Sequence, residues 1–235
     1  MKKTTFILLI LIGLLTLNST AKGKNIQDFI QDLKSNDEKI YDKAAEYLTE
    51  CEDTSIIPIL IESLDNDNAT VRAYMARLLA YKKIKKAIPK IVKLLADNNE
   101  EVRRSAAEAL GDMPDNSSFF PLLKGLEDNN KWVRSFSAAS LGKIKDKRAT
   151  PFLIKTLKDN DGNVKLNAVR ALGVIGDHKA ILPLENIIER DTYSRTIDAS
   201  FRGGRKGEKI TIYPVREEAK KVLEQLKAKE KEGKK

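Results

Sequence analysis

Three stretches with a shared pattern decide the fold of this chain: DNNEEVRRSAAEALG (residues 97–111), DNNKWVRSFSAASLG (128–142) and DNDGNVKLNAVRALG (159–173). They begin 31 residues apart, and each has a Val followed by a basic residue and closes on Leu-Gly. Counted from the Val, positions 0, +4, +5 and +8 are apolar or small, so they share one face of a helix. A fixed period of this length predicts an array of stacked structural units.

The same period extends in both directions along the chain. The Val column reads Ile40, Val71, Val102, Val133 and Val164. Three residues before each of these stands a residue that can accept hydrogen bonds at a helix N-terminus, namely Asp37, Asn68, Asn99, Asn130 and Asp161. Gly111, Gly142 and Gly173 follow the last apolar residue, where we expect a helix C-terminus with left-handed backbone.

A second apolar helix precedes each of these and keeps the period. Its first turn is marked by Pro58, Pro89 and Pro151, where the missing N–H costs little. We predict six helix pairs. The first helices are expected near 25–34, 54–64, 86–96, 117–127, 148–158 and 179–190, and the second near 38–51, 69–82, 100–112, 131–143, 162–174 and 214–228. The predicted fold is all-α, an α-solenoid over residues 22–235.

The pattern Pro-x-Leu-Ile followed by Asp-x4-Val-Arg-x3-Ala-x2-Leu-Gly resembles HEAT repeats, especially the short bacterial type related to phycobilisome-lyase HEAT-like repeats. The resemblance implies a structural ladder between the Asp and Arg columns of stacked repeats. It also implies that the second helices line the concave side, with positions +2, +3 and +6 pointing outward. Family members include bilin lyases, a di-iron hydroxylase that uses repeated His-Glu pairs, and DNA glycosylases. This chain has no repeated His-Glu pair.

The period breaks once, near the end of the array. The next Val is expected near position 195 but appears at Val215, so about 20 residues are inserted, roughly residues 191–213. Two β-type segments, 196–201 and 209–213, flank a glycine-rich basic stretch and predict a β-hairpin. The insert is either a binding element or a surface loop that shields the end of the stack. Residues 229–235 form a charged tail.

The N-terminus has the pattern of a secretory signal peptide over residues 1–21. Lys2 and Lys3 precede an apolar run from Phe6 to Leu17, and small residues lead to a cleavage site after about Ala21. The run is shorter than the roughly 20 residues that a membrane span needs. After cleavage we therefore expect no stable membrane span. We expect a periplasmic or secreted protein, with an uncleaved N-terminal membrane anchor as the alternative.

Composition excludes several function classes. One His and one Cys in 235 residues do not supply the ligands of a metal site, and we predict no metal, no cofactor and no catalytic residue. The net charge of +9 becomes +7 after cleavage, and residues 22–190 are nearly neutral. A nucleic-acid-binding protein needs a broad basic face, so we expect no nucleic acid partner.

Candidate partner-binding residues lie in the outward columns and in the insert. Trp132 and Phe136 are four residues apart on one helix, and large aromatic residues with Arg are typical of interface hot spots. The alternative for Trp132 is local packing over the adjacent turn. The full set is Tyr74, Arg77, Arg104, Trp132, Phe136, Arg170, Arg202, Arg205 and Lys206.

Three further features have plain structural interpretations. The row Lys93, Lys124 and Lys155 is expected on a solvated outer face, Cys51 in a buried apolar column, and His178 in an exposed loop. The predicted function is therefore a non-catalytic scaffold that binds a protein or peptide on the concave face, the insert or both. A lyase-like or other HEAT-repeat enzyme, or a small-ligand binder, is the alternative.

Overall fold

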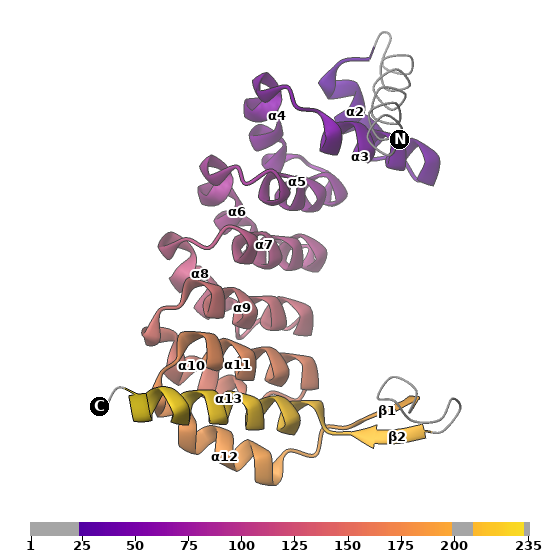
Figure 1. Ribbon diagram of the computed structural model, residues 1–235. Coiled ribbons are helices and arrows are strands. Elements are labelled where there is room, and N and C mark those ends of the chain that lie inside the picture. The colour runs from indigo at the N-terminus through magenta and orange to yellow at the C-terminus, as the bar shows by residue number, and fades with distance from the viewer. Residues whose placement is uncertain (1–23, 199–208, 233–235) are drawn as a thin grey trace, which may run out of the picture.

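A computed structural model describes residues 24–198 and 209–232, which form one layer of short first helices and one layer of longer second helices (Figure 1). The first helices are α2 (Ile26–Asp32), α4 (Ile57–Glu62), α6 (Ile88–Leu94), α8 (Phe119–Gly125), α10 (Thr150–Thr156) and α12 (Ile181–Arg190). The second helices are α3 (Glu38–Glu50), α5 (Ala69–Tyr81), α7 (Glu100–Asp112), α9 (Lys131–Ile144), α11 (Gly162–Ile175) and α13 (Pro214–Glu232). The predicted α-solenoid is confirmed.

Short 3-10 turns complete the first-helix layer. They are η1 (Thr54–Ile56), η2 (Ser63–Asp65), η3 (Lys85–Ala87), η4 (Asn116–Ser118), η5 (Lys147–Ala149) and η6 (His178–Ala180). Five of them run directly into the next first helix, which explains why the apolar pattern starts before the α-helix does. Pro58, Pro89 and Pro151 are the second residues of α4, α6 and α10, so they lie in the first turn, as predicted.

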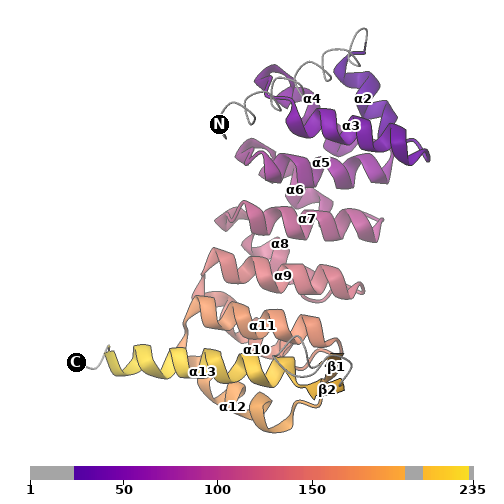
Figure 2. The same cartoon turned by 45° about the vertical axis from the view of Figure 1, so that its right-hand side comes forward.

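The second helices stack side by side, each against the next, from α5 to α13. Figure 2 shows them as successive rungs, and in Figure 1 they lie on the inside of the bend of the stack. Between the two layers, the Leu columns of both helix types are buried, for example Leu60 and Leu122 from the first helices and Leu110 and Leu141 from the second. Each unit thus buries its apolar face against its neighbours, as repeat architectures require.

All five predicted N-caps are present. The Asn68 side chain accepts from the N–H groups of Thr70 and Val71 at 2.8 and 3.2 Å, and Asn99 and Asn130 repeat this geometry. Asp161 does the same for α11, and Asp37 accepts from the N–H of Lys39 alone at the start of α3. These side chains satisfy N–H groups that a helix start leaves without intrahelical partners.

A ladder of Arg and Asp side chains joins consecutive units. Arg103 donates from Nε and Nη2 to the two carboxylate oxygens of Asp128, at 2.7 and 3.1 Å, and from Nη1 to the carbonyls of Asp97 and Asn98. Arg72 with Asp97 and Arg134 with Asp159 repeat this fork. Each Asp also accepts the N–H two residues on, as in Asn130 to Asp128. The ladder that the resemblance implied is therefore present.

The prediction for the three glycines was wrong. Gly111, Gly142 and Gly173 lie inside their helices, and the left-handed residues of the described chain are Lys83, Lys145 and Gly176. The glycines permit close helix packing instead. A Cβ on Gly142 would lie 2.7 Å from the Ala171 Cα, and one on Gly173 would lie 2.8 Å from a Val222 methyl carbon.

The insert forms a two-stranded antiparallel hairpin, β1 (Arg195–Asp198) with β2 (Lys209–Ile212). Arg195 pairs with Ile212 and Asp198 with Lys209. The hairpin projects from the stack at the start of α13 (Figure 1). The predicted β-hairpin is confirmed, and its glycine-rich basic stretch lies outside the described residues.

Gly142→Ala is expected to destabilise the protein by about 1–3 kcal/mol, because the new methyl meets the Ala171 backbone and forces α9 and α11 apart. This loss exceeds the gain of up to about 1 kcal/mol that Ala brings inside a helix. Urea unfolding measures the difference. The control is Gly111→Ala with Ser140→Ala, where the obstructing Ser140 hydroxyl is removed and no backbone is displaced, so the loss should be limited to about 1 kcal/mol for the Ser140 bond to the Ala107 carbonyl.

Acid should weaken the ladder in a defined direction. Burial alone would raise the pKa of Asp97 and Asp128, but the hydrogen bonds from Arg72, Arg103 and backbone N–H groups outweigh it and lower both pKa values. A lowered folded-state pKa contributes stability above the unfolded-state pKa of about 4, and this contribution is lost as pH falls through the folded value. The urea concentration at the midpoint of unfolding should therefore decrease when the pH is lowered below about 4.

The matched variant for this prediction is Asp97→Asn with Asp128→Asn. It is less stable at pH 7 and should lose less additional stability between pH 7 and about pH 3. Identical pH slopes for the parent and the variant would show that the ladder does not contribute to acid sensitivity.

Candidate functional site

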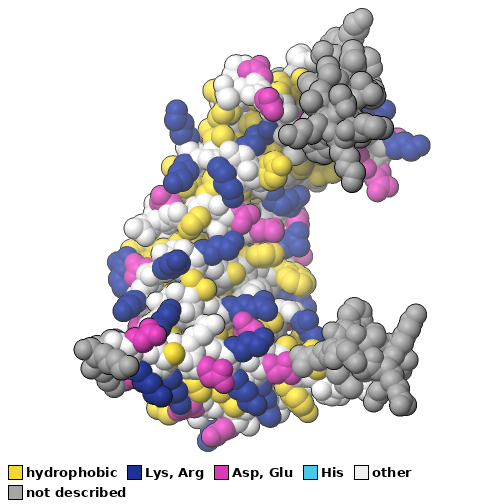
Figure 3. All heavy atoms as spheres, in the orientation of Figure 1, with side chains coloured by type: hydrophobic (Ala, Val, Ile, Leu, Met, Phe, Trp, Pro, Cys, Tyr) yellow, Lys and Arg dark blue, Asp and Glu magenta, His cyan; other side chains and the backbone are white. Residues whose placement is uncertain are grey.

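The exposed side of α5, α7, α9 and α11 is the candidate partner surface, and we call it the second-helix face. Lys and Arg, Asp and Glu, and hydrophobic side chains are interspersed over it (Figure 3). The helices below it are held by the ladder and by the close glycine contacts, so the backbone that carries its side chains is rigidly positioned. This is a suitable base for recognition because little order must be gained on binding.

Trp132 lies in the first turn of α9 and is 42% exposed. Its backbone N–H donates to the side-chain oxygen of Asn130, and the Lys131 ammonium lies 5.6 Å from the ring centroid. Phe136, one turn later on the same helix, is half-buried against the core. The indole is thus the large apolar group that α9 offers to solvent.

Two of the predicted Arg residues meet at one carboxylate. Arg77 donates to Glu101 at 3.2 Å and to the Ser105 hydroxyl at 2.6 Å, and Arg104 donates to Glu101 at 2.7 Å. The Nε of Arg104 is buried and has no hydrogen-bond partner within the described part of the chain. Glu101 was missing from the sequence-based set, although it occupies the same column as Trp132 one repeat earlier.

The hydroxyl of Tyr74, on α5, forms hydrogen bonds to α3. The hydroxyl donates to the Ala45 carbonyl at 2.7 Å and lies 2.9 Å from the Thr49 hydroxyl. Burial raises the pKa of Tyr74, and the ring packs edge-on against Tyr41. The side chain therefore joins α5 to α3, and only part of it is available at the surface.

The prediction that the whole +3 column points outward was wrong. Ser105 is fully buried, and Asn167 donates to the Ser135 hydroxyl of the preceding repeat at 2.8 Å. The third position lies at the seam between consecutive second helices, because these helices pack so closely. The +6 column is more accessible, and its Arg170 is exposed and lies 3.5 Å from Glu218 of α13.

The base of the hairpin is fixed to the stack by residues that the sequence analysis did not single out. The Tyr193 ring covers Gly162 at the start of α11, where a Cβ would lie 2.3 Å from the ring. Arg195 donates to the Tyr193 hydroxyl and to the Asn163 side chain. Gly162 stands where other repeats have Ala69, Glu100 or Lys131, and this missing side chain was the sequence signal that a large residue packs over the start of α11. Arg202, Arg205 and Lys206 lie outside the described residues.

The insert leaves the ladder complete. Lys165 replaces Arg and forms an ion pair with Asp191, whose carbonyl accepts from Arg216 of α13. Asp191 is buried and also accepts the N–H of Tyr193 at 2.9 Å. The inserted residues therefore follow Asp191, the last acidic residue of the ladder, and α13 still packs on α11.

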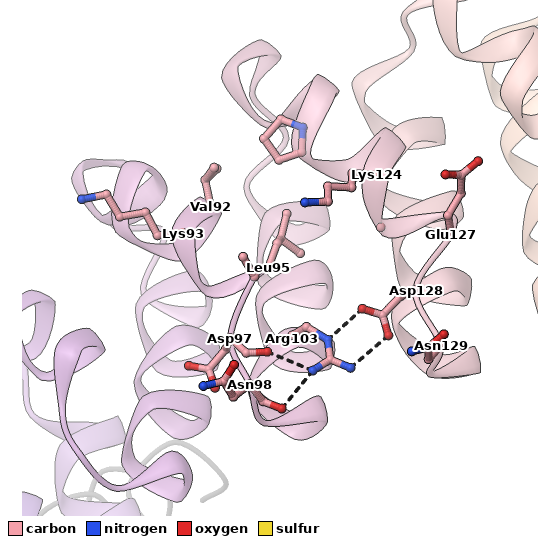
Figure 4. Close-up of a pocket in the computed structure, with 13 residues that line it drawn as sticks. Val92, Lys93, Leu95, Asp97, Asn98, Arg103, Lys124, Glu127, Asp128 and Asn129 are labelled. Carbon is pink, nitrogen blue, oxygen red and sulfur yellow. Dashed lines mark hydrogen bonds and ion pairs between the residues drawn. The ribbon is translucent and has the colours of Figure 1, made fainter.

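On the opposite layer, a cavity of about 770 Å³ lies between α6 and α8 (Figure 4). Its lower wall is the Arg103–Asp128 rung, and Lys124 extends toward α6 whereas Lys93 points away. The charged groups of this wall bond each other, so they belong to the ladder that joins the repeats and are not free to bind a ligand in the cavity. Lys93, Lys124 and Lys155 are exposed as predicted, and Lys155 pairs with Glu127 at 2.8 Å.

The remaining single residues are partly as predicted. His178 is exposed, whereas Cys51 is half-buried, because it follows the last residue of α3 and its carbonyl accepts from Lys82. Within residues 24–198 and 209–232, no group of three or more His, Cys, Asp or Glu side chains could hold a metal ion. In the same residues no helix is both long and apolar enough to span a bilayer.

Comparisons with known proteins agree on the architecture. An engineered protein of known structure is 21% identical, with 87% of this chain and 97% of that chain covered and a TM-score of 0.57. Computationally designed armadillo repeat proteins for modular peptide recognition are 20% identical (86% and 99% covered, TM-score 0.53). A designed armadillo repeat protein in complex with the peptide (KR)4 is also 20% identical (86% and 100% covered, TM-score 0.52).

These identities show a shared fold alone, and no curated protein matches the chain in sequence. The model of the family described as HEAT repeats matches residues 57–119 and 119–202, which is more than half of the chain. With the helix pairs, the 31-residue period and the Arg–Asp ladder, this match shows that the chain belongs to the HEAT-repeat family.

Proposed function

We propose that this protein is a non-catalytic scaffold that binds a protein or peptide on the second-helix face. The observation that carries the proposal is the exposed indole of Trp132 in the middle of a rigid helical array. Trp is among the residues most enriched in binding hot spots, and an exposed Trp on an ordered helix has few structural reasons to be there.

The surroundings of Trp132 support a partner with an apolar group flanked by hydrogen-bond acceptors. Phe136 and the half-buried Leu166 extend the apolar surface, and Arg104 on the preceding helix has a buried Nε without a partner in the described chain. The Nε itself is closed to a partner, but the Arg104 side chain is 33% exposed, so a carbonyl or carboxylate of a bound peptide would bond the exposed edge of this guanidinium.

The hairpin extends the same surface. Asn163 occupies the Trp132 column one repeat later, and its side chain accepts from Arg195 of β1. A peptide that covers Trp132 and continues along the array therefore reaches the base of the hairpin. The designed armadillo neighbours support peptide recognition by this type of stacked array, at the level of the fold.

The setting we propose is the bacterial cell envelope or the medium outside the cell. The support is the charged, then apolar, then small-residue pattern of residues 1–21.

Trp132→Ala should cost about 1 kcal/mol of stability or less, because the ring is largely outside the core. Leu141→Ala, on the same helix but fully buried, should cost about 2–5 kcal/mol. Urea melts of both variants give the comparison. Equal losses would mean that Trp132 is a packing residue and would remove the main support for the binding surface.

The function itself is tested by crosslinking capture from the native envelope fraction. The bait is the chain from Lys22 onward, compared with Trp132→Ala/Phe136→Ala and with a variant lacking residues 194–212. The deletion is geometrically mild because Arg195 and Ile212 are paired at the base of the hairpin.

A partner that the parent captures and one variant loses identifies the binding surface. The matched control is Lys39→Ala/Lys43→Ala on α3, two exposed residues away from Trp132. No capture by any folded variant, or equal capture by all of them, contradicts the proposal.

A further inference from the structure

The segments that lead from each second helix into the next first helix form a second surface, which we call the turn edge. It consists of residues 81–86, 112–120, 143–152 and 174–182 and follows the left-hand side of the stack in Figure 1. Neighbouring segments touch. Lys83 and Lys143 both donate to Asp112, at 3.0 Å each, and the Arg148 guanidinium lies 4.7 Å from the Phe119 ring centroid. Since α10 also contacts η6, the turn edge is continuous across four repeats.

Apolar side chains are concentrated on this edge. Of the eight exposed large hydrophobic residues in the described chain, five belong to it. Tyr81, Phe120 and Leu182 are 70%, 69% and 67% exposed, and Phe152 and Val174 are the other two. Phe120 and Leu182 occupy the same position of their repeats, in the first turns of α8 and α12, and Tyr81 and Val174 share another position, whereas Phe152 stands one residue later in the first turn of α10.

The same segments are basic. They contain nine Lys or Arg residues against four Asp residues. Three of the Asp side chains cap 3-10 turns, namely Asp115, Asp146 and Asp177, and the fourth is Asp112, which pairs with Lys143. The acidic groups are therefore already bonded within the edge.

Several cations of the edge lack a counter-ion. Lys86, Lys147 and Lys179 are exposed and form no ion pair with any described residue, and Lys85 is exposed and lies near enough to Asp115 to help lower the pKa of that carboxyl group. The last turns of α13 extend this surface, since the Lys229 Nζ lies 3.8 Å from where a Cβ of Gly176 would be. In Figure 3, Lys and Arg side chains recur along this side of the molecule.

We propose that the turn edge docks on the surface of an anionic phospholipid bilayer. The unpaired Lys side chains meet the headgroups, and the row of Tyr81, Phe120, Phe152, Val174 and Leu182 enters the interfacial region. Aromatic and aliphatic side chains beside Lys and Arg are the composition of interfacial membrane-binding surfaces. A soluble polyanion would account for the Lys residues and would leave the exposed apolar row without a role.

This docking leaves the second-helix face free. The turn edge lies at the C-terminal ends of the second helices, whereas Trp132 and the hairpin lie at their N-terminal ends. A membrane-docked protein therefore still presents the proposed partner surface to the surroundings, and the two proposals fail or succeed separately.

The test is co-sedimentation with vesicles of phosphatidylcholine alone or of phosphatidylcholine with about one-third phosphatidylglycerol. The protein is the chain from Lys22 onward, which keeps every described residue and excludes any contribution of the apolar run from Phe6 to Leu17 to vesicle binding. Binding is expected to the anionic vesicles, to be absent with the neutral ones, and to weaken at least about tenfold when salt rises from about 0.05 to 0.5 M.

Two variants separate the contributions of charge and apolar contact. Lys85→Glu/Lys86→Glu/Lys147→Glu should reduce the partition coefficient at least about tenfold. Tyr81→Ser/Phe120→Ser/Leu182→Ser should also reduce it by about tenfold, at unchanged charge. The control Lys39→Glu/Lys43→Glu/Lys158→Glu has the same net charge as the first variant, carries its changes away from the edge, and should retain more than half of the binding.

Circular dichroism melts keep the result interpretable, because all substituted side chains are exposed and each variant should fold like the parent. Three outcomes overturn the proposal. The first is that the parent does not bind anionic vesicles. The second is that the edge and control Lys variants lose vesicle binding equally. The third is that the Ser variant binds vesicles fully and binds heparin as well as the parent does. The last outcome would identify the edge as a polyanion site.

Discussion

The bidentate bond between an Arg in one second helix and an Asp in the next repeat is the constraint on which the stack depends. The guanidinium closes a loop between two units, because its third nitrogen bonds the carbonyls that precede its own helix. A planar fork fixes distance and rotation together, which a point charge does not. Since the same fork recurs at Arg72, Arg103 and Arg134, each unit is related to the next by nearly the same step.

Much of the fold follows from local chemistry visible in the sequence. The helix starts were predictable because Asn or Asp three residues before Val has one obvious role, and the structure shows each of these side chains as a cap. The hairpin was predictable because β-type residues interrupted a strict helical period. The role of Gly111, Gly142 and Gly173 was not, since a glycine near a helix end permits two explanations and only the neighbouring helix decides between them.

The candidate surface was less accessible to sequence reasoning than the fold. A column position says which way a side chain leaves its own helix, but accessibility depends on how closely the next helix approaches. Ser105 became fully buried and Tyr74 became a connection to α3 for this reason. Trp132 was recognisable because its residue type conflicts with an exposed column, and the contacts of Tyr193 and Arg195 were not, because they depend on how the hairpin leaves the stack.

The contact between α3 and α5 differs from the others and has a consequence for how the array unfolds. Along the seams from α5 to α11, small residues face each other, as at Gly142 and Ala171, and at the α11–α13 seam Gly173 faces Val222. At the equivalent places α3 and α5 have Thr49 and Leu78, and these two helices approach each other less closely. In a one-dimensional array, cooperativity is set by the nearest-neighbour coupling at each seam. The first unit is therefore the weakly coupled end of the array, from which melting begins, and amide hydrogens in α2 and α3 exchange sooner than those of the central repeats.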